Sequence, residues 1–394
     1  MKKEILFLGG ARTPMGEYGG VLKDFTANEL GAIAAAEALR RSGVAADRID
    51  HTVFGNALQT SRDAIYGARH VALRAGVPID KPALTVNRLC GSGIQSIICG
   101  AQMIQLDEAA TCLVGGMESM SQAPHVIWGA RTGFKLGQGK LEDWLMVSLL
   151  DGYCGFYMAQ TAENLARKHE ISREAQDAFA LRSQQLAAAA HEAGRLRDEI
   201  VPVEITSRKG TVTFDHDDHM RPDTTLEGLA KLPTSFGKDG FVTAGNASGI
   251  VDGAAALVIA GEDTATALGA KPMGRLVSYA TAGVEPSEMG IGPVPSTRIA
   301  LEKAGLTLGD IDLIEVNEAF AAQYLAVERE LDLNRDCVNV NGGAIALGHP
   351  LGASGARLVL TLLHELRRRG KRYGLATACI GGGQGIAMIV ESIA

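Results

Sequence analysis

Residues 374–383 read GLATACIGGG, a short apolar run that passes through Cys379 into three consecutive glycines. Similar apolar runs occupy residues 5–8, 52–54, 112–114, 257–259, 313–316 and 386–390. Longer alanine-rich stretches with helical spacing separate them. Runs of this length are typical of buried strands, and their alternation with helices predicts an α/β fold.

Two of the helical stretches carry signals at their ends. Thr26 and Glu29 have the spacing of a capping box, and Gly43 is placed to end the same helix. Ser172 is placed to cap a second helix, which we expect to run to about Gly194.

The two halves of the chain share three landmarks in the same order. In the first half Asn56 precedes a Ser-Gly pair at residues 92–93. In the second half Asn317 precedes a Ser-Gly pair at residues 354–355 by nearly the same distance. In each half an apolar run then leads into a glycine cluster, at residues 115–116 and 381–383. We interpret this order as a duplicated α/β unit, with chance similarity as the alternative.

Residues 121–249 lack these landmarks. They are mixed in charge and rich in Met, Trp, Tyr and Phe. Because long insertions often carry binding function, we predict an inserted binding region between the two halves.

The composition excludes several classes of protein. Of the 394 residues, 46% are hydrophobic and 21% are charged, which predicts an ordered protein of two or three domains. A net charge of −7 disfavours a broad nucleic-acid surface. No apolar run approaches the ~20 residues that span a bilayer. Neither a nucleic acid nor a membrane is therefore an expected partner.

The cysteines and the amino terminus predict the compartment. Six cysteines are scattered without paired spacing, and the apolar run in MKKEILFLGG is too short for a secretory signal. We therefore expect a reducing, cytoplasmic location.

The stretch 87–98, NRLCGSGIQSII, places Cys90 at the start of a predicted helix, after a strand-like run at 83–86. The helix N-terminus would lower the pKa of a thiol there toward the reactive thiolate, and the small residues that follow leave room for a substrate. Taken alone, however, the segment favours a buried structural cysteine.

The stretch 342–357, GGAIALGHPLGASGAR, holds His349 in a rigid turn between Gly348 and Pro350. This turn would present the imidazole at the start of the next helix. A neighbouring histidine is the ordinary means of activating a sulfur nucleophile. A hydrogen-bonded turn histidine is an equally good interpretation.

Cys379 and Asn317 complete the set of candidates. The glycines after Cys379 offer backbone N–H groups that could converge on an oxyanion, and a second thiol could exchange protons there. A tight turn with a packed cysteine is the alternative. Asn317, in VNEAF (316–320), could hold a water or orient the imidazole, or it could cap a helix that begins at Glu318.

Searches for other motifs are negative. The chain has no G-x-x-x-x-G-K-[ST], and GGGQG after Cys379 lacks the spacing of G-x-G-x-x-G. His216 and His219 lie in DHDDH (215–219), a charged turn with no cysteine nearby, so no metal is expected.

Four blocks together resemble the signature blocks of the thiolase family, in the same order. NRLCGSG contains Cys90, and NEAFA contains Asn317. GGAIALGHPLGASGAR contains His349, and CIGGGQG contains Cys379. GGMESMSQAP, TAENLA and TAGNASG extend the resemblance over nearly the whole chain.

The resemblance implies a layered α-β-α-β-α fold. It implies an N-terminal core of residues 1–120 with 250–272, and a C-terminal core of residues 273–394. Between them it implies an inserted loop domain, residues 121–249, that binds coenzyme A.

The resemblance also implies roles by motif position. Cys90 would be the acylated nucleophile, His349 would activate it, and Cys379 would be the acid/base for the second substrate. Asn317 would hold a water that forms one oxyanion hole with His349, while backbone N–H groups of Cys90 and Gly381 form the other. Coenzyme A is expected as a substrate, without any prosthetic group, and the residues implied to meet it are Arg221, Ser248, Met158, Phe236, Ala244 and Phe320.

Within the family, DAIYGARHVALRAGVP and LLHELRRRG are most similar to the mitochondrial-type 3-ketoacyl-CoA thiolases. This implies an acyltransferase of fatty-acid β-oxidation, a dimer or tetramer, that reversibly cleaves 3-ketoacyl-CoA through acyl-Cys90. Acetoacetyl-CoA-specific acetyltransferases are the alternative, although Tyr157 replaces the histidine of their His-Met pair. An inactive lipid-binding relative would lack a catalytic side chain, and a decarboxylating ketosynthase would have a histidine in place of Cys379.

Overall fold

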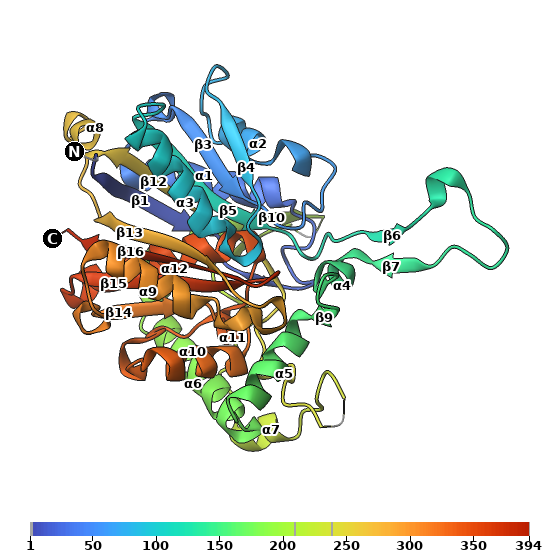
Figure 1. Cartoon of the computed structure of the whole chain (residues 1–394). Coiled ribbons are helices and arrows are strands. Elements are labelled where there is room, and N and C mark those ends of the chain that lie inside the picture. Colours follow the sequence, from blue (N-terminus) through green and yellow to red (C-terminus); the bar gives the residue numbers. More distant parts are fainter. Residues whose placement is uncertain (1–2, 209, 238, 394) are drawn as a thin grey trace.

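A single mixed sheet organises the molecule (Figure 1). The computed structural model describes residues 3–208, 210–237 and 239–393. Within that part of the chain, nine strands follow one path, and β2 (Gly16–Glu17) pairs with β12 beside it. In order across the sheet they are β14 (Leu313–Val316), β15 (Tyr373–Ile380), β16 (Gln384–Ser392), β13 (Gly274–Gly283), β1 (Ile5–Arg12), β12 (Val251–Gly261), β5 (Thr111–Glu118), β3 (His51–Gly55) and β4 (Ala83–Val86).

The strand order repeats between the two halves of the chain. β3, β5, β12 and β1 follow one another as β14, β15, β16 and β13 do, and in each set the first pair is parallel and the next two are antiparallel. The halves join where β1 and β13 pair, through Leu6 with Arg275 and Phe7 with Gly274. The predicted duplication is confirmed.

The predicted strands are present, and one long strand of the main sheet was not predicted. All seven short apolar runs lie in strands, as does the run at 83–86. β13, GRLVSYATAG, has no such run because several of its side chains are only half-buried. A partly exposed strand does not need a continuous apolar stretch.

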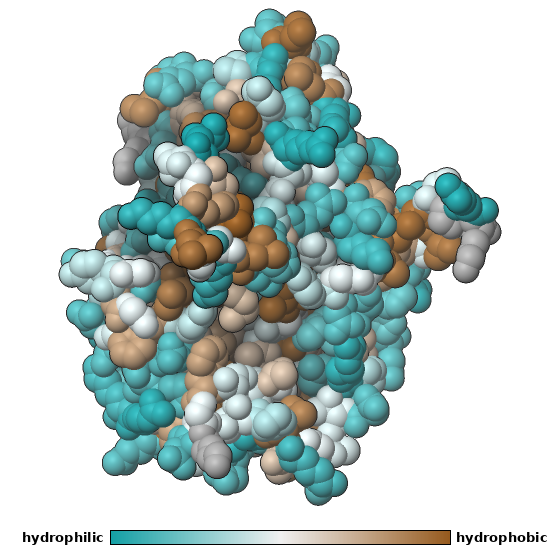
Figure 2. All heavy atoms as spheres, turned by 90° about the vertical axis from the view of Figure 1, so that its right-hand side faces the viewer, coloured by the Kyte–Doolittle hydropathy of each residue, from teal (hydrophilic) through white to brown (hydrophobic). Residues whose placement is uncertain are grey.

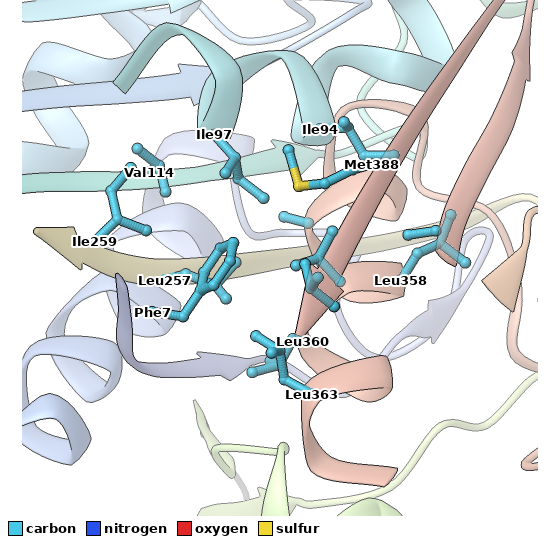
Figure 3. Packing of buried hydrophobic residues seen from close by; sticks show 14 of the residues in the cluster. Phe7, Ile94, Ile97, Val114, Leu257, Ile259, Leu358, Leu360, Leu363 and Met388 are labelled. Atoms are coloured by element: carbon cyan, nitrogen blue, oxygen red, sulfur yellow. The ribbon is translucent and has the colours of Figure 1, made fainter. Parts of the chain in front are cut away.

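Side chains alternate between the two faces of each strand, so one face of the sheet packs on a central core and the other face packs on outer helices. Together these give five layers. Phe7, Leu257 and Met388 point into a central core that includes Ile94 and Leu363 (Figure 3). This core holds α3 (Ser92–Gln105) and α12 (Leu351–Arg369). The opposite strand faces pack on the outer helices, which are α1 (Ala27–Ser42) and α2 (Gly67–Arg74) on the N-terminal half, and α9 (Pro293–Ala304) and α10 (Ala321–Leu331) on the C-terminal half.

The repeated Ser-Gly pairs lie where α3 crosses α12. A Cβ atom on Gly93 would collide with the backbone nitrogen of Ala356, and one on Gly355 would collide with that of Ile94. Only glycine allows backbones to approach this closely. The close crossing brings the start of each central helix, and the residues just before it, to the middle of the molecule.

The predicted caps are also found. Thr26 and Glu29 form a reciprocal capping box on α1, and Gly43 ends that helix at φ 69°. The Ser172 side chain accepts a hydrogen bond from the Ala175 N–H group and caps α6 (Arg173–Glu192), which ends two residues before Gly194.

Between β5 and β12 the chain forms a separate set of elements. A hairpin, β6 (His125–Ile127) and β7 (Leu141–Asp143), projects far from the body (Figure 1). The remaining elements are α4 (Trp144–Ser148), β8 (Leu150–Asp151), β9 (Phe156–Tyr157), α5 (Met158–Lys168), α6, β10 (Val203–Ser207), β11 (Gly210–Phe214) and α7 (Leu226–Ala230). Elsewhere in the described ranges lie α8 (Glu262–Ala267), α11 (Ala344–Leu347) and six short 3₁₀ turns, including η3 (Leu89–Gly91) and η6 (Pro286–Ile291).

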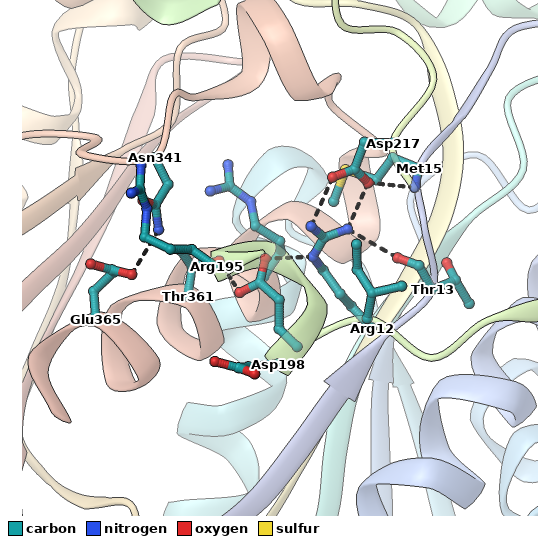
Figure 4. A network of polar contacts seen from close by, with 12 residues as sticks. Arg12, Thr13, Met15, Arg195, Asp198, Asp217, Asn341, Thr361 and Glu365 are labelled. Carbon is teal, nitrogen blue, oxygen red and sulfur yellow. Dashed lines mark hydrogen bonds and ion pairs between the residues drawn. The ribbon is translucent and has the colours of Figure 1, made fainter. Parts of the chain in front are cut away.

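A buried ionic network ties this segment to both halves (Figure 4). Arg12, fully buried on β1, donates two hydrogen bonds to the Asp217 carboxylate, at 2.7 and 2.8 Å. It donates another to Glu199, which also accepts one from the Thr361 hydroxyl on α12. The single guanidinium is shared by two carboxylates, and these contacts tie Glu199 and Asp217 to the core.

No described helix combines the length and the apolar character needed to cross a membrane.

Candidate active site

Cys90 lies in η3, immediately before α3, and its side chain is half-buried. Leu89 turns the chain there with a φ of 46°, a left-handed conformation that a leucine rarely adopts. The backbone N–H groups of Gly381 and of Cys90 itself lie close enough to the thiol to act on its pKa, which they lower. Two donors from different halves of the molecule therefore converge at this sulfur atom.

The pKa of the Cys90 thiol is not lowered. Burial raises it to about 11, although the N–H groups of Gly381 and Cys90 act in the opposite direction, and the charge of Glu118 raises it further. The expectation that the field of the helix would produce a resting thiolate is therefore wrong. Loss of hydration outweighs the helix terminus because it penalises only the charged form.

Cys379 ends β15 and is fully buried. Burial raises the pKa of its thiol, and the neighbouring Cys90 raises it further, which places the two sulfurs close enough to interact. The glycines that follow make the β15–β16 turn, with Gly382 and Gly383 at φ 77° and 79°. Met158, Phe320 and Met289 pack with Cys379 in one small apolar cluster.

His349 is almost completely buried in the turn before α12. Its Nδ1 lies 2.5 Å from the Ser354 hydroxyl, which in turn lies 3.1 Å from the Pro350 carbonyl and donates to it. Since the hydroxyl proton is used on Pro350, Nδ1–H donates to Ser354, and the lone pair is on Nε2, where it accepts from the Asn317 side chain. Burial lowers the pKa of His349 to about 3, so the imidazole is neutral and can accept a proton.

Asn317 stands beside this base. Its Nδ2 is 3.3 Å from His349 Nε2, and its backbone N–H donates to the Thr377 carbonyl at 2.9 Å. The side chain is fully buried, and its Oδ1 has no partner among the residues described. Asn317 does not cap a helix at Glu318, because α10 begins at Ala321 with Phe320 as its N-cap. Glu318 instead accepts hydrogen bonds from Ser183, Asn339 and the Ile345 N–H group.

Three of the residues expected to meet coenzyme A lie at the site. Met158 and Phe320 pack with Cys379, and the Ser248 N–H group donates to the Ala319 carbonyl at 3.0 Å. The other three lie further out. Phe236 packs on Tyr157, with ring centroids 5.7 Å apart, and Ala244 is exposed. Arg221 is half-exposed and donates a 2.6 Å hydrogen bond to Glu17.

Two residues of the site were not predicted from the sequence. Met289, in η6, packs beside Cys379 but belongs to a segment with no motif. Glu118 is fully buried at the end of β5, and its charge acts on Cys90. An acidic residue that ends an otherwise apolar strand is the signal that could have identified Glu118.

Across the described ranges, no group of three or more His, Cys, Asp and Glu side chains is arranged to hold a metal ion. His216 instead contacts Asp215, and the ring of His219 lies over Gly249.

The family follows from sequence comparison. Residues 5–263 match the family model of the thiolase N-terminal domain, and residues 270–392 match that of the thiolase C-terminal domain. Together they account for nearly all of the chain, which therefore belongs to the thiolase family.

Individual relatives support the same assignment. The chain is 57% identical over 391 residues to the human mitochondrial 3-ketoacyl-CoA thiolase, covering 99% of this chain and 98% of the relative. It is 49% identical to an acetyl-CoA acetyltransferase of Syntrophomonas wolfei, with full coverage of both (100% and 100%). The crystal structure of the human mitochondrial 3-ketoacyl-CoA thiolase in complex with CoA superposes with a TM-score of 0.97 at 56% identity, covering 100% of this chain and 98% of that one.

Proposed function

We propose that this protein is a 3-ketoacyl-CoA thiolase, which cleaves 3-ketoacyl-CoA with coenzyme A to acetyl-CoA and a shortened acyl-CoA. The observation that carries the proposal is the convergence of two N–H donors and a second thiol on Cys90. A nucleophile with oxyanion donors beside it and an acid within reach is what a carbon–carbon cleavage at a thioester requires.

The first half-reaction begins with both partners uncharged. The Cys90 sulfur attacks the 3-keto carbon while its proton passes to Nε2 of His349. The imidazolium forms together with the negatively charged oxygen of the attacked carbonyl, because burial disfavours an isolated thiolate or imidazolium here. The bond between C2 and C3 then breaks, leaving acyl-Cys90 and the enolate of acetyl-CoA. Cys379 gives its proton to the enolate carbon, which completes acetyl-CoA.

The second half-reaction restores the site. Coenzyme A gives its thiol proton to the Cys379 thiolate and attacks the acyl group on Cys90. The Cys90 sulfur leaves and recovers its proton from His349. Two half-reactions through one covalent intermediate predict ping-pong kinetics.

The surrounding residues support coenzyme A as the partner. Met158, Phe320 and Met289 give Cys379 an apolar wall, which suits an acyl chain or the reactive arm of the cofactor. Arg221, half-exposed, suits a phosphate, which would have to replace its present partner Glu17.

The test is a cleavage assay with 3-ketoacyl-CoA substrates of 4 to 16 carbons in the presence of coenzyme A. We expect cleavage of chains longer than 4 carbons, with parallel double-reciprocal plots. No cleavage at any length would exclude the proposed function. A clear preference for the 4-carbon substrate would instead favour the acetoacetyl-CoA acetyltransferase, the activity named for the Syntrophomonas relative.

We also propose that the β6–β7 hairpin joins copies of this chain in a tetramer. The hairpin exposes several large apolar side chains, and Figure 2, which faces the end from which it projects, shows hydrophobic residues gathered at the centre of that face. The exposed apolar side chains of the hairpin are Ile127 (40% exposed), Trp128 (58%), Phe134 (43%), Leu136 (106%) and Leu141 (62%). So much exposed apolar surface on an isolated projection marks an interface.

Light scattering coupled to gel filtration tests this proposal. The intact protein is expected at four times the chain mass of 41.3 kDa. A variant in which Leu136 and Phe134 are replaced by serine is expected at the dimer mass with its catalytic rate retained. A tetramer that survives this double substitution would show that the hairpin does not hold it.

A further inference from the structure

The buried carboxylate of Glu118 collects four hydrogen bonds, all of them from N–H donors. Oε1 accepts from Asn56 Nδ2 at 2.7 Å and from the Leu58 N–H group at 3.1 Å. Oε2 accepts from the Ala57 N–H group at 3.0 Å and from the Gly352 N–H group at 2.8 Å. No solvent reaches the side chain. Burial raises the pKa of this carboxyl to about 7, and the N–H donors act in the opposite direction because they favour its ionised form.

Two of these donors belong to the wall of the pocket around Cys90. Ala57 and Leu58 form one apolar cluster with Cys90 and Leu351. Both Ala57 and Leu58 are held through their backbone nitrogens by Glu118. The position of this wall against the thiol therefore depends on the carboxylate.

The fourth donor belongs to the turn that carries His349. Pro350 is the N-cap of α12 and provides no side-chain cap, so the first N–H groups of the helix need an outside acceptor. Glu118 supplies it at Gly352, three residues after His349, from the other half of the molecule. The fit is tight, since a Cβ on Gly352 would lie 2.5 Å from the Met117 carbonyl oxygen.

We propose that Glu118 is a positioning residue that fixes the pocket wall of Cys90 to the turn of His349, across the junction of the two halves. Nucleophile and base come from different halves, so their alignment needs such a link. The ionised carboxylate also disfavours a resting thiolate at Cys90. The proposal rests on the proposed thiolase function for its kinetic readout only.

The experiment compares Glu118→Gln, Glu118→Asp and a matched control, Glu199→Gln, in the full-length protein. Glu199 is equally buried and accepts from Arg12 and Thr361, and nothing connects it to Cys90. Each variant is assayed for kcat and for the KM of coenzyme A. The rate of Cys90 alkylation by iodoacetamide is followed from pH 8 to 12 by mass spectrometry of the Cys90 peptide.

In Glu118→Gln an amide N–H₂ group faces two of the four donors, so the link is broken. We expect kcat to fall by about 10²-fold with little change in KM, because misalignment of reacting groups costs that much. The midpoint of Cys90 alkylation is expected to move about one unit to lower pH, because a like charge is removed. Cys379 and Asp252 also face this region, and both are unchanged in the variant.

Glu118→Asp keeps the charge but cannot span the same donors. This variant is expected to leave the alkylation midpoint at the wild-type pH while lowering kcat. If Glu118→Gln does not fold, Glu118→Asp alone tests the proposal. Glu199→Gln is expected to lower the unfolding temperature without moving kcat or the midpoint. Wild-type kcat in both Glu118 variants, or equal shifts in Glu199→Gln, would overturn the proposal. Alkylation does not require turnover, so an inactive wild-type protein would exclude the thiolase activity and leave this readout intact.

Discussion

Cys90→Ala is expected to lower thiolase turnover by at least about 10⁴-fold, because no other group can carry the acyl chain between the two half-reactions. Incubation of the intact protein with an acyl-CoA should add the mass of one acyl group to the peptide that contains Cys90. The variant should show neither turnover nor this adduct. Since the side chain is small and half-buried, its removal should leave the fold unchanged.

Cys99→Ala is the matched control. Cys99 lies on α3, the helix that follows the nucleophile, and it is half-buried like Cys90. Among the described residues, its thiol has one side-chain hydrogen bond, which it accepts from Gln95 at 3.3 Å. The control should keep both the turnover and the adduct. Persistent acylation in Cys90→Ala would show that a different residue is the nucleophile.

The sequence alone predicts much of this fold because its signals are local. Buried strands have continuous apolar runs, and caps such as Thr26 and Ser172 act on the turn next to them. The duplication was visible because the two Ser-Gly pairs serve one purpose, the close crossing of α3 and α12. β13 was missed because its exposure depends on the strands and helices packed around it, which no short window contains.

The residues of the site also divide into those that the sequence predicts and those that it does not. The motif residues could be found because each sits at the end of a strand or the start of a helix. Glu118 could not be placed, because the Asn56 and Gly352 groups that bind it are 62 and 234 residues away in sequence. The direction of the Cys90 pKa shift could not be predicted from the sequence either. The helix terminus that would lower it is local, whereas the burial that raises it comes from the whole fold.

Cys379→Ala is expected to separate the two halves of the chemistry. General acid–base groups contribute about 10²–10⁴-fold, so cleavage of 3-ketoacyl-CoA should fall by that factor. Acylation of Cys90 by a simple acyl-CoA needs no proton on carbon, and its leaving group, the coenzyme A thiolate, is stable without a proton from Cys379, so the adduct should still form, although more slowly. Exchange of the acetyl-CoA methyl protons with D₂O, which does need a base beside that carbon, should be lost. The measurements are the steady-state rate, the adduct mass and the proton spectrum.

A structural role for Cys379 would give a different pattern. The side chain packs in an apolar cluster with Met289 and Ala319, so a cavity alone could disturb the site. Loosening of that kind would reduce acylation of Cys90 and carbon–carbon cleavage together. Cys379→Ser fills nearly the same space but replaces the thiol by a hydroxyl, which is a far weaker acid. If Cys379 moves the proton, the serine variant should lose cleavage as the alanine variant does and should still acylate Cys90, whereas recovery of cleavage by serine would assign Cys379 to packing.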